Sequence, residues 1–252
     1  MYKRQDNDIT EFYKLIDRAL DDELIFIADP ILDPISYGFT DSLVRYVNLR
    51  EKYPDIHIMM GLGNITELTH ADTSGINMIM LGIIEELKLN HILTTQVSRH
   101  CSTVIRETDL ARRIIHAASE NNLTPKHIND GLLVHHGHKD YAFCSDELIE
   151  MQGNIKDKNY RIYVNDDGIH LFNKNVYKIF SDPFDFYEHL EVSDDAGHAF
   201  YLGVELARAQ IAHQLQKEYQ QDEELSWGCL VDKKVDNKLQ SKELGPTFKK
   251  RK

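Results

Sequence analysis

Two polar side chains that could bind a small molecule each follow a short apolar segment. Asp29 comes directly after Leu24-Ile-Phe-Ile-Ala28, and Asn64 ends the turn Gly61-Leu-Gly-Asn64. A carboxylate accepts charge-assisted N–H bonds in pairs, and a carboxamide both donates and accepts. Glycines such as Gly61 and Gly63 let a flat ligand approach the backbone closely. These residue types are suited to binding the edge of a planar, hydrogen-bonding heterocycle.

A second pair of residues could bind an anion. Arg99 and His100 end the segment Thr94-Thr-Gln-Val-Ser-Arg99-His100, just before a predicted helix. In barrels of alternating strands and helices, late loops that lead into a helix N-terminus are the usual phosphate site. Arg99 and His100 are therefore the candidate anion ligands. The alternative for Arg99 is a surface ion pair with Glu107 or Asp109.

The other candidates also have structural alternatives. Asp29-Pro30 could act only as a turn that leads into a helix, and Asn64 could be present because it tolerates a left-handed turn. We favour the ligand roles, because both side chains are expected where parallel strands end. For Asp33 a loop N-cap is the preferred interpretation.

Hydrophobic periodicity predicts the elements that position these residues. Helices are expected over residues 7–20, 40–52, 73–87 and 103–119, and apolar strands over residues 24–28, 56–60 and 92–97. Continuous apolar strands are typical of a parallel sheet that is buried on both faces. Three strand–helix units are too few to close an eightfold barrel. The predicted fold class is α/β, with residues 7–122 forming the C-terminal part of a TIM (β/α)8 barrel.

The pattern changes after residue 125. Strands are expected at 131–135, 160–164, 169–172 and 176–180, followed by a long helix over 195–220. Asn165-Asp-Asp-Gly168 predicts a hairpin, because Asp-Gly supplies a positive φ. Residues 126–232 are thus expected to form a small α+β appendage, with residues 233–252 as a disordered polar tail. No metal site is expected, since His135, His136 and His138 would alternate across a strand.

Composition limits the class of protein. The chain has 252 residues, 42% hydrophobic and 28% charged, with a net charge of −12. This balance indicates a globular protein without a nucleic-acid or membrane partner. Three widely spaced cysteines and the lack of a signal sequence favour the cytoplasm. Residues 1–6 are interpreted as a sequencing scar, since Met1-Tyr-Lys-Arg-Gln5 resembles a translated transposon-end adaptor; the alternative is an ordinary polar tail.

Several motifs together resemble the pterin-binding barrel family, which includes dihydropteroate synthase. They are Asp29-Pro-Ile-Leu-Asp-Pro, Gly61-Leu-Gly-Asn64-Ile-Thr and the terminal Arg99-His100. Residues 197–210 and 221–228 resemble the C-terminal region of dihydropteroate synthase-related proteins of methanopterin-type cofactor synthesis. Gly63 stands where the family usually has serine, and the lysine of the synthase Ser-Arg-Lys-Ser-Phe motif is missing. The family's early strands are also missing, so the chain looks truncated at its N-terminus.

The resemblance implies a function and a set of ligands. It implies condensation of a hydroxymethyl-dihydropterin pyrophosphate with an arylamine in folate or methanopterin-type biosynthesis. Asp29, Asn64, Gly61 and Gly63 would then bind the pterin, and Arg99 and His100 the pyrophosphate. No tightly bound cofactor is implied, although Mg²⁺ could accompany the pyrophosphate, and a homodimer is left open. The alternatives are a non-catalytic pterin-binding scaffold and a pterin-dependent methyltransferase, and no catalytic residue is assigned.

Overall fold

The computed structural model describes the backbone of residues 6–232 and the side chains of residues 9–232. It has a mixed α/β fold, and the described chain divides into two compact units between Leu132 and Leu133. Each unit is described here by itself. The predicted tail, 233–252, and all of the predicted scar except Asp6 lie outside the described residues.

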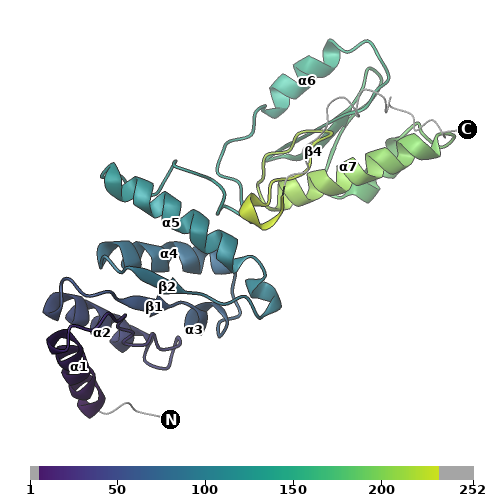
Figure 1. Cartoon of the computed structure of the whole chain (residues 1–252). Helices are drawn as coiled ribbons and strands as arrows, with labels where there is room; N and C mark the ends of the chain where they lie inside the picture. The colour runs from purple at the N-terminus through teal and green to yellow at the C-terminus, as the bar shows by residue number, and fades with distance from the viewer. Residues whose placement is uncertain (1–5, 233–252) are drawn as a thin grey trace, which may run out of the picture. The chain divides into compact units, whose positions relative to one another are not determined.

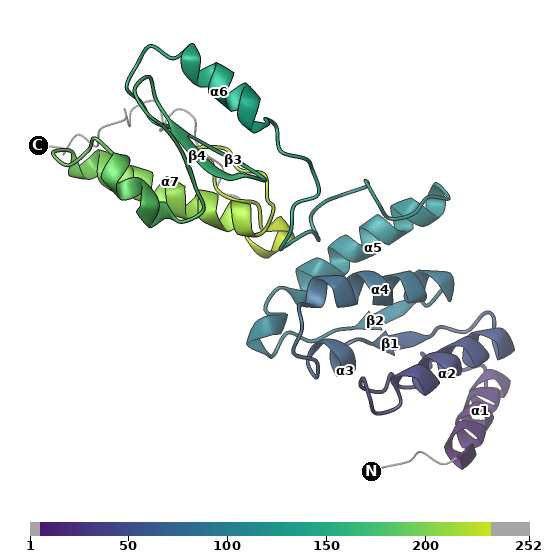
Figure 2. The same ribbon diagram turned by 180° about the vertical axis from the view of Figure 1, so that it is seen from behind.

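The first unit alternates helices with short parallel strands (Figures 1 and 2). Its elements, in chain order, are α1 (Asp6–Asp21), α2 (Phe39–Lys52), β1 (Met59–Gly61), α3 (Gly63–Thr66), α4 (Thr73–Glu86), β2 (His91–Leu93), the 3₁₀ helix η1 (Arg99–Cys101) and α5 (Val104–Glu120). The four long helices match the expected ones. Helices α4 and α5 pack side by side.

Three consecutive segments of this unit pair in the order of the chain. Ala28 forms a parallel bridge with Ile58, and β1 pairs in parallel with β2 in the register Met59↔His91. The amide of Ala28 donates to the carbonyl of His57 at 2.8 Å, and the amide of Met59 donates to the carbonyl of Ala28 at 2.9 Å. Because the pairing is parallel, the carboxyl ends of all three segments lie at one edge. No closed barrel is formed by the described residues.

The predicted strand over residues 24–28 is wrong in its extent and in its burial. Only Ala28 pairs, while Ile25 is fully exposed and Leu24 is 59% exposed. A continuous apolar run signals burial only if backbone partners lie on both sides, and the described residues supply a partner on one side. The third predicted strand, 92–97, is also shorter, since β2 ends at Leu93.

The core of the first unit lies between the strands and their helices. Tyr46, Leu49, Ile58, Met60 and Leu62 are fully buried. Each aliphatic side chain removed from water in this way contributes about 1.5–3 kcal/mol.

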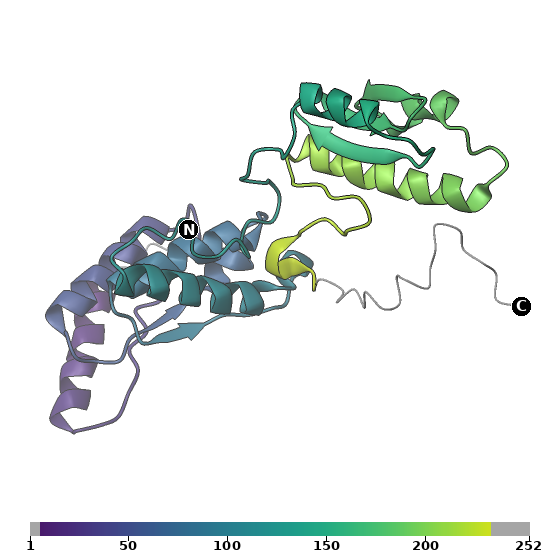
Figure 3. The ribbon, with the colours of Figure 1, turned by 90° about the horizontal axis from the view of Figure 1, so that it is seen from above.

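The second unit is an antiparallel sheet with helices packed on it (Figure 3). Its elements are α6 (Ser145–Gly153), β3 (Arg161–Asn165), β4 (Gly168–Phe172), β5 (Tyr177–Phe180), the 3₁₀ helix η2 (Pro183–His189), α7 (Ala196–Gln214) and the 3₁₀ helix η3 (Gly228–Leu230). The predicted hairpin is confirmed, with Asn165 paired to Gly168, whose φ is 141°. Helix α7 packs against β3 and β4.

The structure corrects the predictions for the second unit in three places. Residues 131–135 form no strand, and the long helix predicted over 195–220 ends at Gln214. An additional helix, α6, spans Ser145–Gly153. Helix α6 carries a capping box between Cys144 and Glu147. Cysteine is not among the residues that usually mark an N-cap, so the sequence pattern does not predict this helix start.

The Arg50 guanidinium connects the chain just before β1 with the chain just before β2. Its nitrogens donate to the carbonyl oxygens of Pro54 at 2.6 Å, Lys88 at 2.9 Å, Leu87 at 3.0 Å and Ile56 at 3.1 Å. Burial lowers the pKa of Arg50 from its ordinary value. A charged donor that satisfies several carbonyl groups fixes the amino ends of the strands.

We expect Arg50→Met to destabilise the first unit by about 2–4 kcal/mol, because several carbonyl groups lose a charged donor. Urea unfolding followed by far-ultraviolet circular dichroism should show the loss. Trp227, the chain's single tryptophan, belongs to the second unit, so its fluorescence transition should not move. Arg18→Met, which removes a highly exposed side chain, is the matched control. Equal stability of the two variants would contradict the role of Arg50.

Candidate functional site

A small pocket opens at the carboxyl ends of the three parallel segments. Its volume is about 290 Å³, close to the lower end of the range for small-molecule sites. It is lined by Asp29, Ile31, Leu32, Gly61, Gly63, Asn64, Glu67, Leu68, Leu93 and Thr95. Four of the six residues predicted from the sequence therefore share one pocket: Asp29, Gly61, Gly63 and Asn64. Their ligand roles stay predictions.

Asp29 uses one carboxylate oxygen within the protein. Its Oδ1 accepts from the amide of Ile31 at 2.9 Å and lies 3.3 Å from the Tyr46 hydroxyl, which is also 3.2 Å from the carbonyl of Met59. Burial first, and then the charge of Asp29, raise the pKa of Tyr46 far above its ordinary value, so Tyr46 stays a neutral donor. The bond from the Ile31 amide forms a turn, which is the alternative role considered for Asp29 in the sequence analysis. Among the described residues, Asp29 Oδ2 has no partner and remains able to bind a ligand.

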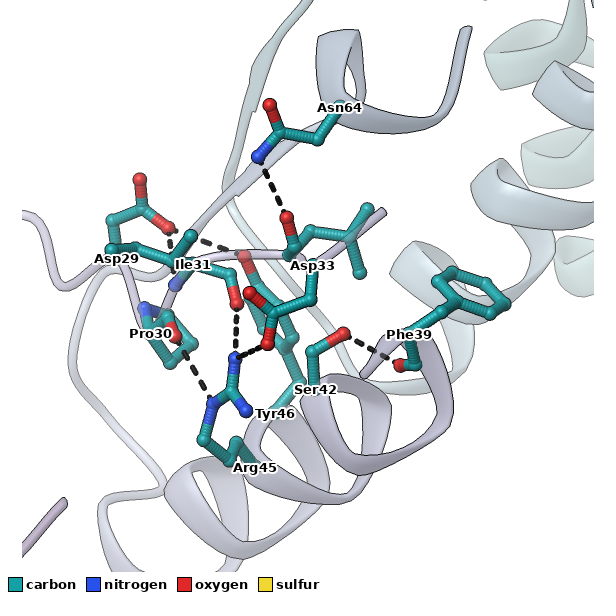
Figure 4. Close-up of polar contacts among 10 residues, drawn as sticks. Asp29, Pro30, Ile31, Asp33, Phe39, Ser42, Arg45, Tyr46 and Asn64 are labelled. Carbon is teal, nitrogen blue, oxygen red and sulfur yellow. Dashed lines mark hydrogen bonds and ion pairs between the residues drawn. The ribbon is translucent and has the colours of Figure 1, made fainter. Parts of the chain in front are cut away.

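The loop after Ala28 is held in a constrained conformation (Figure 4). Ile31 has a φ of 63°, which is rare for a β-branched residue. The Arg45 guanidinium donates to the carbonyl of Ile31 at 2.8 Å and to Asp33 Oδ2 at 2.7 Å. Gly38, and not Asp33, is the N-cap residue of α2, and Asp33 forms an ion pair with Arg45.

Asn64 links two loops at the rim of the pocket. Its Nδ2 donates to the carbonyl of Leu32 at 2.7 Å. Figure 4 marks this bond by the dashed line that starts at Asn64. Asn64 lies in α3 with right-handed backbone geometry, so the left-handed turn considered as its alternative role is wrong. The bond to Leu32 uses one N–H of the amide, so Asn64 keeps Oδ1 as an acceptor and a second N–H as a donor.

The two glycines have different roles. A Cβ built at Gly61 would meet nothing within 4 Å, whereas a Cβ built at Gly63 would lie 2.8 Å from Thr95 Oγ1. Gly61 therefore leaves open space beside its backbone, and its ligand role stays a prediction. Gly63 is required by the close approach of the loop after β2.

Sequence reasoning missed Glu67, which also lines the pocket. Its carboxylate accepts from the amides of Val97 at 2.7 Å and Ser98 at 2.9 Å, and from the Thr95 hydroxyl at 3.3 Å. These bonds, that from Val97 first, lower the pKa of Glu67 to about 2. The glutamate is therefore ionised at physiological pH. No sequence signal pairs Glu67 with residues some thirty positions later; only the short helix α3 brings it to them.

Arg99 and His100 are not part of this pocket. They lie in η1, before α5 as predicted, and the Nε2 of His100 lies 3.0 Å from the carbonyl of Thr66. The surface pair considered for Arg99 is not formed. Glu107 is buried and accepts from Thr73 and Thr103, while Asp109 pairs with Arg112 and Arg113. Arg99 is exposed, so an anion could reach it only outside the pocket.

Within the described part of the chain, no group of three or more His, Cys, Asp and Glu residues is arranged to hold a metal ion. No helix there is long and apolar enough to cross a membrane.

Comparison with known proteins identifies one related sequence. The chain is 31% identical over 241 residues to the uncharacterized protein MJ0107 of Methanocaldococcus jannaschii. The match spans 84% of this chain but 44% of MJ0107, so the chain covers less than half the length of that relative. No protein-family model matches the chain, and no solved structure matches it.

We expect Gly63→Ala to lower the stability of the first unit by about 1–3 kcal/mol, because the new methyl group overlaps Thr95. The double variant Gly63→Ala/Thr95→Ala should recover most of this loss, since the Cβ that remains at position 95 lies 3.8 Å from the new methyl group. Gly61→Ala should leave the thermal unfolding midpoint unchanged. Failure of the double variant to recover stability would contradict the contact.

The stability of the loop after β2, which is bonded to Glu67, should depend on pH. A depressed carboxylate pKa contributes stability that is present above the unfolded value of about 4.5 and is lost as the pH falls toward 2. Hydrogen exchange of the Val97 and Ser98 amides should therefore show constant protection from pH 8 to 5 and falling protection below. In Glu67→Gln the protection should already be low at pH 7. Equal protection in the two proteins at pH 7 would exclude this role of Glu67.

Proposed function

We propose that this chain is a pterin-binding protein of the dihydropteroate synthase type and forms the C-terminal part of a TIM (β/α)8 barrel. The observation that carries this proposal is one pocket that brings together Asp29, Asn64 and Gly61 at the carboxyl ends of parallel strands. In (β/α) barrels this is the functional face. The pairing of three segments in chain order supports the barrel arrangement.

The chemistry of the pocket suits the amino-pyrimidinone edge of a pterin. Asp29 Oδ2 can accept N–H groups from the 2-amino and N3 positions, in the charge-assisted manner that makes such pairs short and specific. Asn64 Oδ1 adds a second acceptor, and the open space at Gly61 admits the flat ring. The loop is already held by Arg45 and Asn64, so it is arranged before the ligand arrives.

The reaction proposed on the basis of the resemblance is condensation of a pterin pyrophosphate with an arylamine. It requires stabilisation of the departing pyrophosphate and alignment of the two reactants. Arg99 and His100 remain the proposed anion ligands, with Mg²⁺ as a possible companion of the pyrophosphate.

A non-catalytic pterin-binding protein or a pterin-dependent methyltransferase is the second candidate. It is favoured by the position of Arg99 and His100 outside the pocket, because these alternatives need no anion site beside the ring. Turnover of pterin pyrophosphate with an arylamine would support the synthase. Pterin binding without condensation would favour the second candidate.

The proposed role of Asp29 in ligand binding can be tested separately from its role in the turn. Asp29→Asn keeps an oxygen that can accept from the Ile31 amide but removes the charge. We expect pterin binding to weaken by about ten- to a hundredfold, the loss for a hydrogen bond to a charged group. Asp29→Ala should abolish binding. Isothermal calorimetry with 6-hydroxymethyl-dihydropterin is the measurement.

Asp33→Asn is the matched control for Asp29→Asn, because Asp33 also precedes a proline in the same loop but pairs with Arg45 outside the pocket. The dissociation constant for the pterin should change by less than about fivefold in Asp33→Asn, as expected for the loss of a partly exposed ion pair. Equal affinity of Asp29→Asn and the unmodified chain would refute the ligand role of Asp29.

A further inference from the structure

Tyr46 contacts the pocket residue Asp29 from the core of the first unit. The side chain of Tyr46 belongs to α2 and is fully buried. Its hydroxyl lies 3.3 Å from Asp29 Oδ1 and 3.2 Å from the carbonyl oxygen of Met59 in β1. Figure 4 shows the contact with Asp29. Tyr46 itself does not line the pocket, so it can affect a ligand there only through a residue that does.

The Tyr46 hydroxyl has one proton and two neighbouring acceptors. Burial first, and then the charge of Asp29, hold the pKa of Tyr46 far above its ordinary value, so the hydroxyl stays protonated. A charged acceptor forms a stronger hydrogen bond than a neutral one. When Asp29 is ionised, the proton is therefore attracted to the carboxylate more strongly than to the carbonyl oxygen of Met59.

Two donors hold the same oxygen of Asp29. The Ile31 amide donates to Oδ1 at 2.9 Å from within the loop, and the Tyr46 hydroxyl approaches the same atom from α2. The preceding residue of α2, Arg45, donates to the carbonyl of Ile31. Consecutive residues of one helix thus hold the loop and the carboxylate that it carries. Because a carboxylate is a rigid planar group, holding Oδ1 also limits the positions open to Oδ2, the oxygen proposed to bind the ring.

Resting on the pterin-binding function proposed above, we infer that Tyr46 is a positioning residue, whose hydroxyl orients the Asp29 carboxylate for the N–H groups of the ligand. An acceptor that is oriented before the ligand arrives loses less conformational entropy on binding. This contribution of Tyr46 requires the negative charge of Asp29. The requirement distinguishes it from a tyrosine that only fills the core or satisfies the carbonyl of Met59.

A double-mutant cycle on the full chain tests this requirement, with 6-hydroxymethyl-dihydropterin as the ligand and isothermal calorimetry as the measurement. Tyr46→Phe removes the hydroxyl and keeps the ring. We expect it to raise the dissociation constant by about three- to tenfold, within the range for residues in direct contact. In the Asp29→Asn background the same change should raise it by less than about twofold, because a neutral acceptor bonds the Tyr46 proton less strongly.

Tyr53→Phe is the matched control. Tyr53 is another buried tyrosine of the first unit, and its hydroxyl donates to a carboxylate oxygen, Asp17 Oδ1, at 2.6 Å, but it does not line the pocket. This change should leave the dissociation constant unchanged. If Tyr46→Phe weakens binding equally in both backgrounds, or does not weaken it at all, Tyr46 supports only the fold and its assignment as a positioning residue is overturned.

A measurement without ligand decides the case in which Tyr46→Phe does not fold. In the chain prepared with isotope-labelled tyrosine, Asp29→Asn should shift the nuclear magnetic resonance signal of Tyr46 Cζ and leave that of Tyr53 Cζ in place. An unchanged Tyr46 signal would mean that the hydroxyl is not bonded to Asp29, and the positioning role would be overturned.

The outcomes also separate this inference from the proposed function. If the unmodified chain binds no pterin, the proposed function fails and the positioning role of Tyr46 is rejected with it. If the unmodified chain binds the pterin but the cycle shows no coupling between Tyr46 and Asp29, only the positioning role fails.

Discussion

The parallel pairing of three short backbone segments is the constraint on which the first unit depends. Only a few hydrogen bonds hold the segments at Ala28, Ile58 and His91 next to one another. Because the three segments run in the same direction, the loops that follow them begin at the same edge of the sheet. Each segment passes into a loop at the same edge. Asp29, Gly61 and Leu93 meet at one pocket for this reason, although they are distant in the chain.

The amino ends and the carboxyl ends of these parallel strands differ in their chemistry. At the amino ends, the Arg50 guanidinium satisfies carbonyl groups that precede β1 and β2, and burial lowers its pKa without changing its function as a donor. At the carboxyl ends, the Glu67 carboxylate stays ionised beside the pocket, since its pKa is about 2. In (β/α) barrels the amino-terminal face is generally associated with stability and the carboxyl-terminal face with the functional loops.

The sequence was informative wherever side-chain burial alone decides the structure. The long helices follow from their apolar periodicity, and the hairpin at Gly168 follows from the requirement for a positive φ. The positions of Asp29 and Asn64 followed from the rule that parallel strands share a carboxyl edge. Sequence patterns did not predict the structure where it depends on contacts with a distant part of the chain. Residues 24–27 are apolar but have no strand pairing, and Glu67 faces a loop that only tertiary structure brings near.

The backbone at Ile31 has a consequence for how the first unit meets a small molecule. A β-branched residue with a φ of 63° persists only where its surroundings over-determine it. Here Asp29 fixes its amide and Arg45 fixes its carbonyl. The conformational entropy of this rim is therefore lost during folding and not during association. A ligand would encounter a rigid receptor, so complex formation would require little rearrangement of the chain.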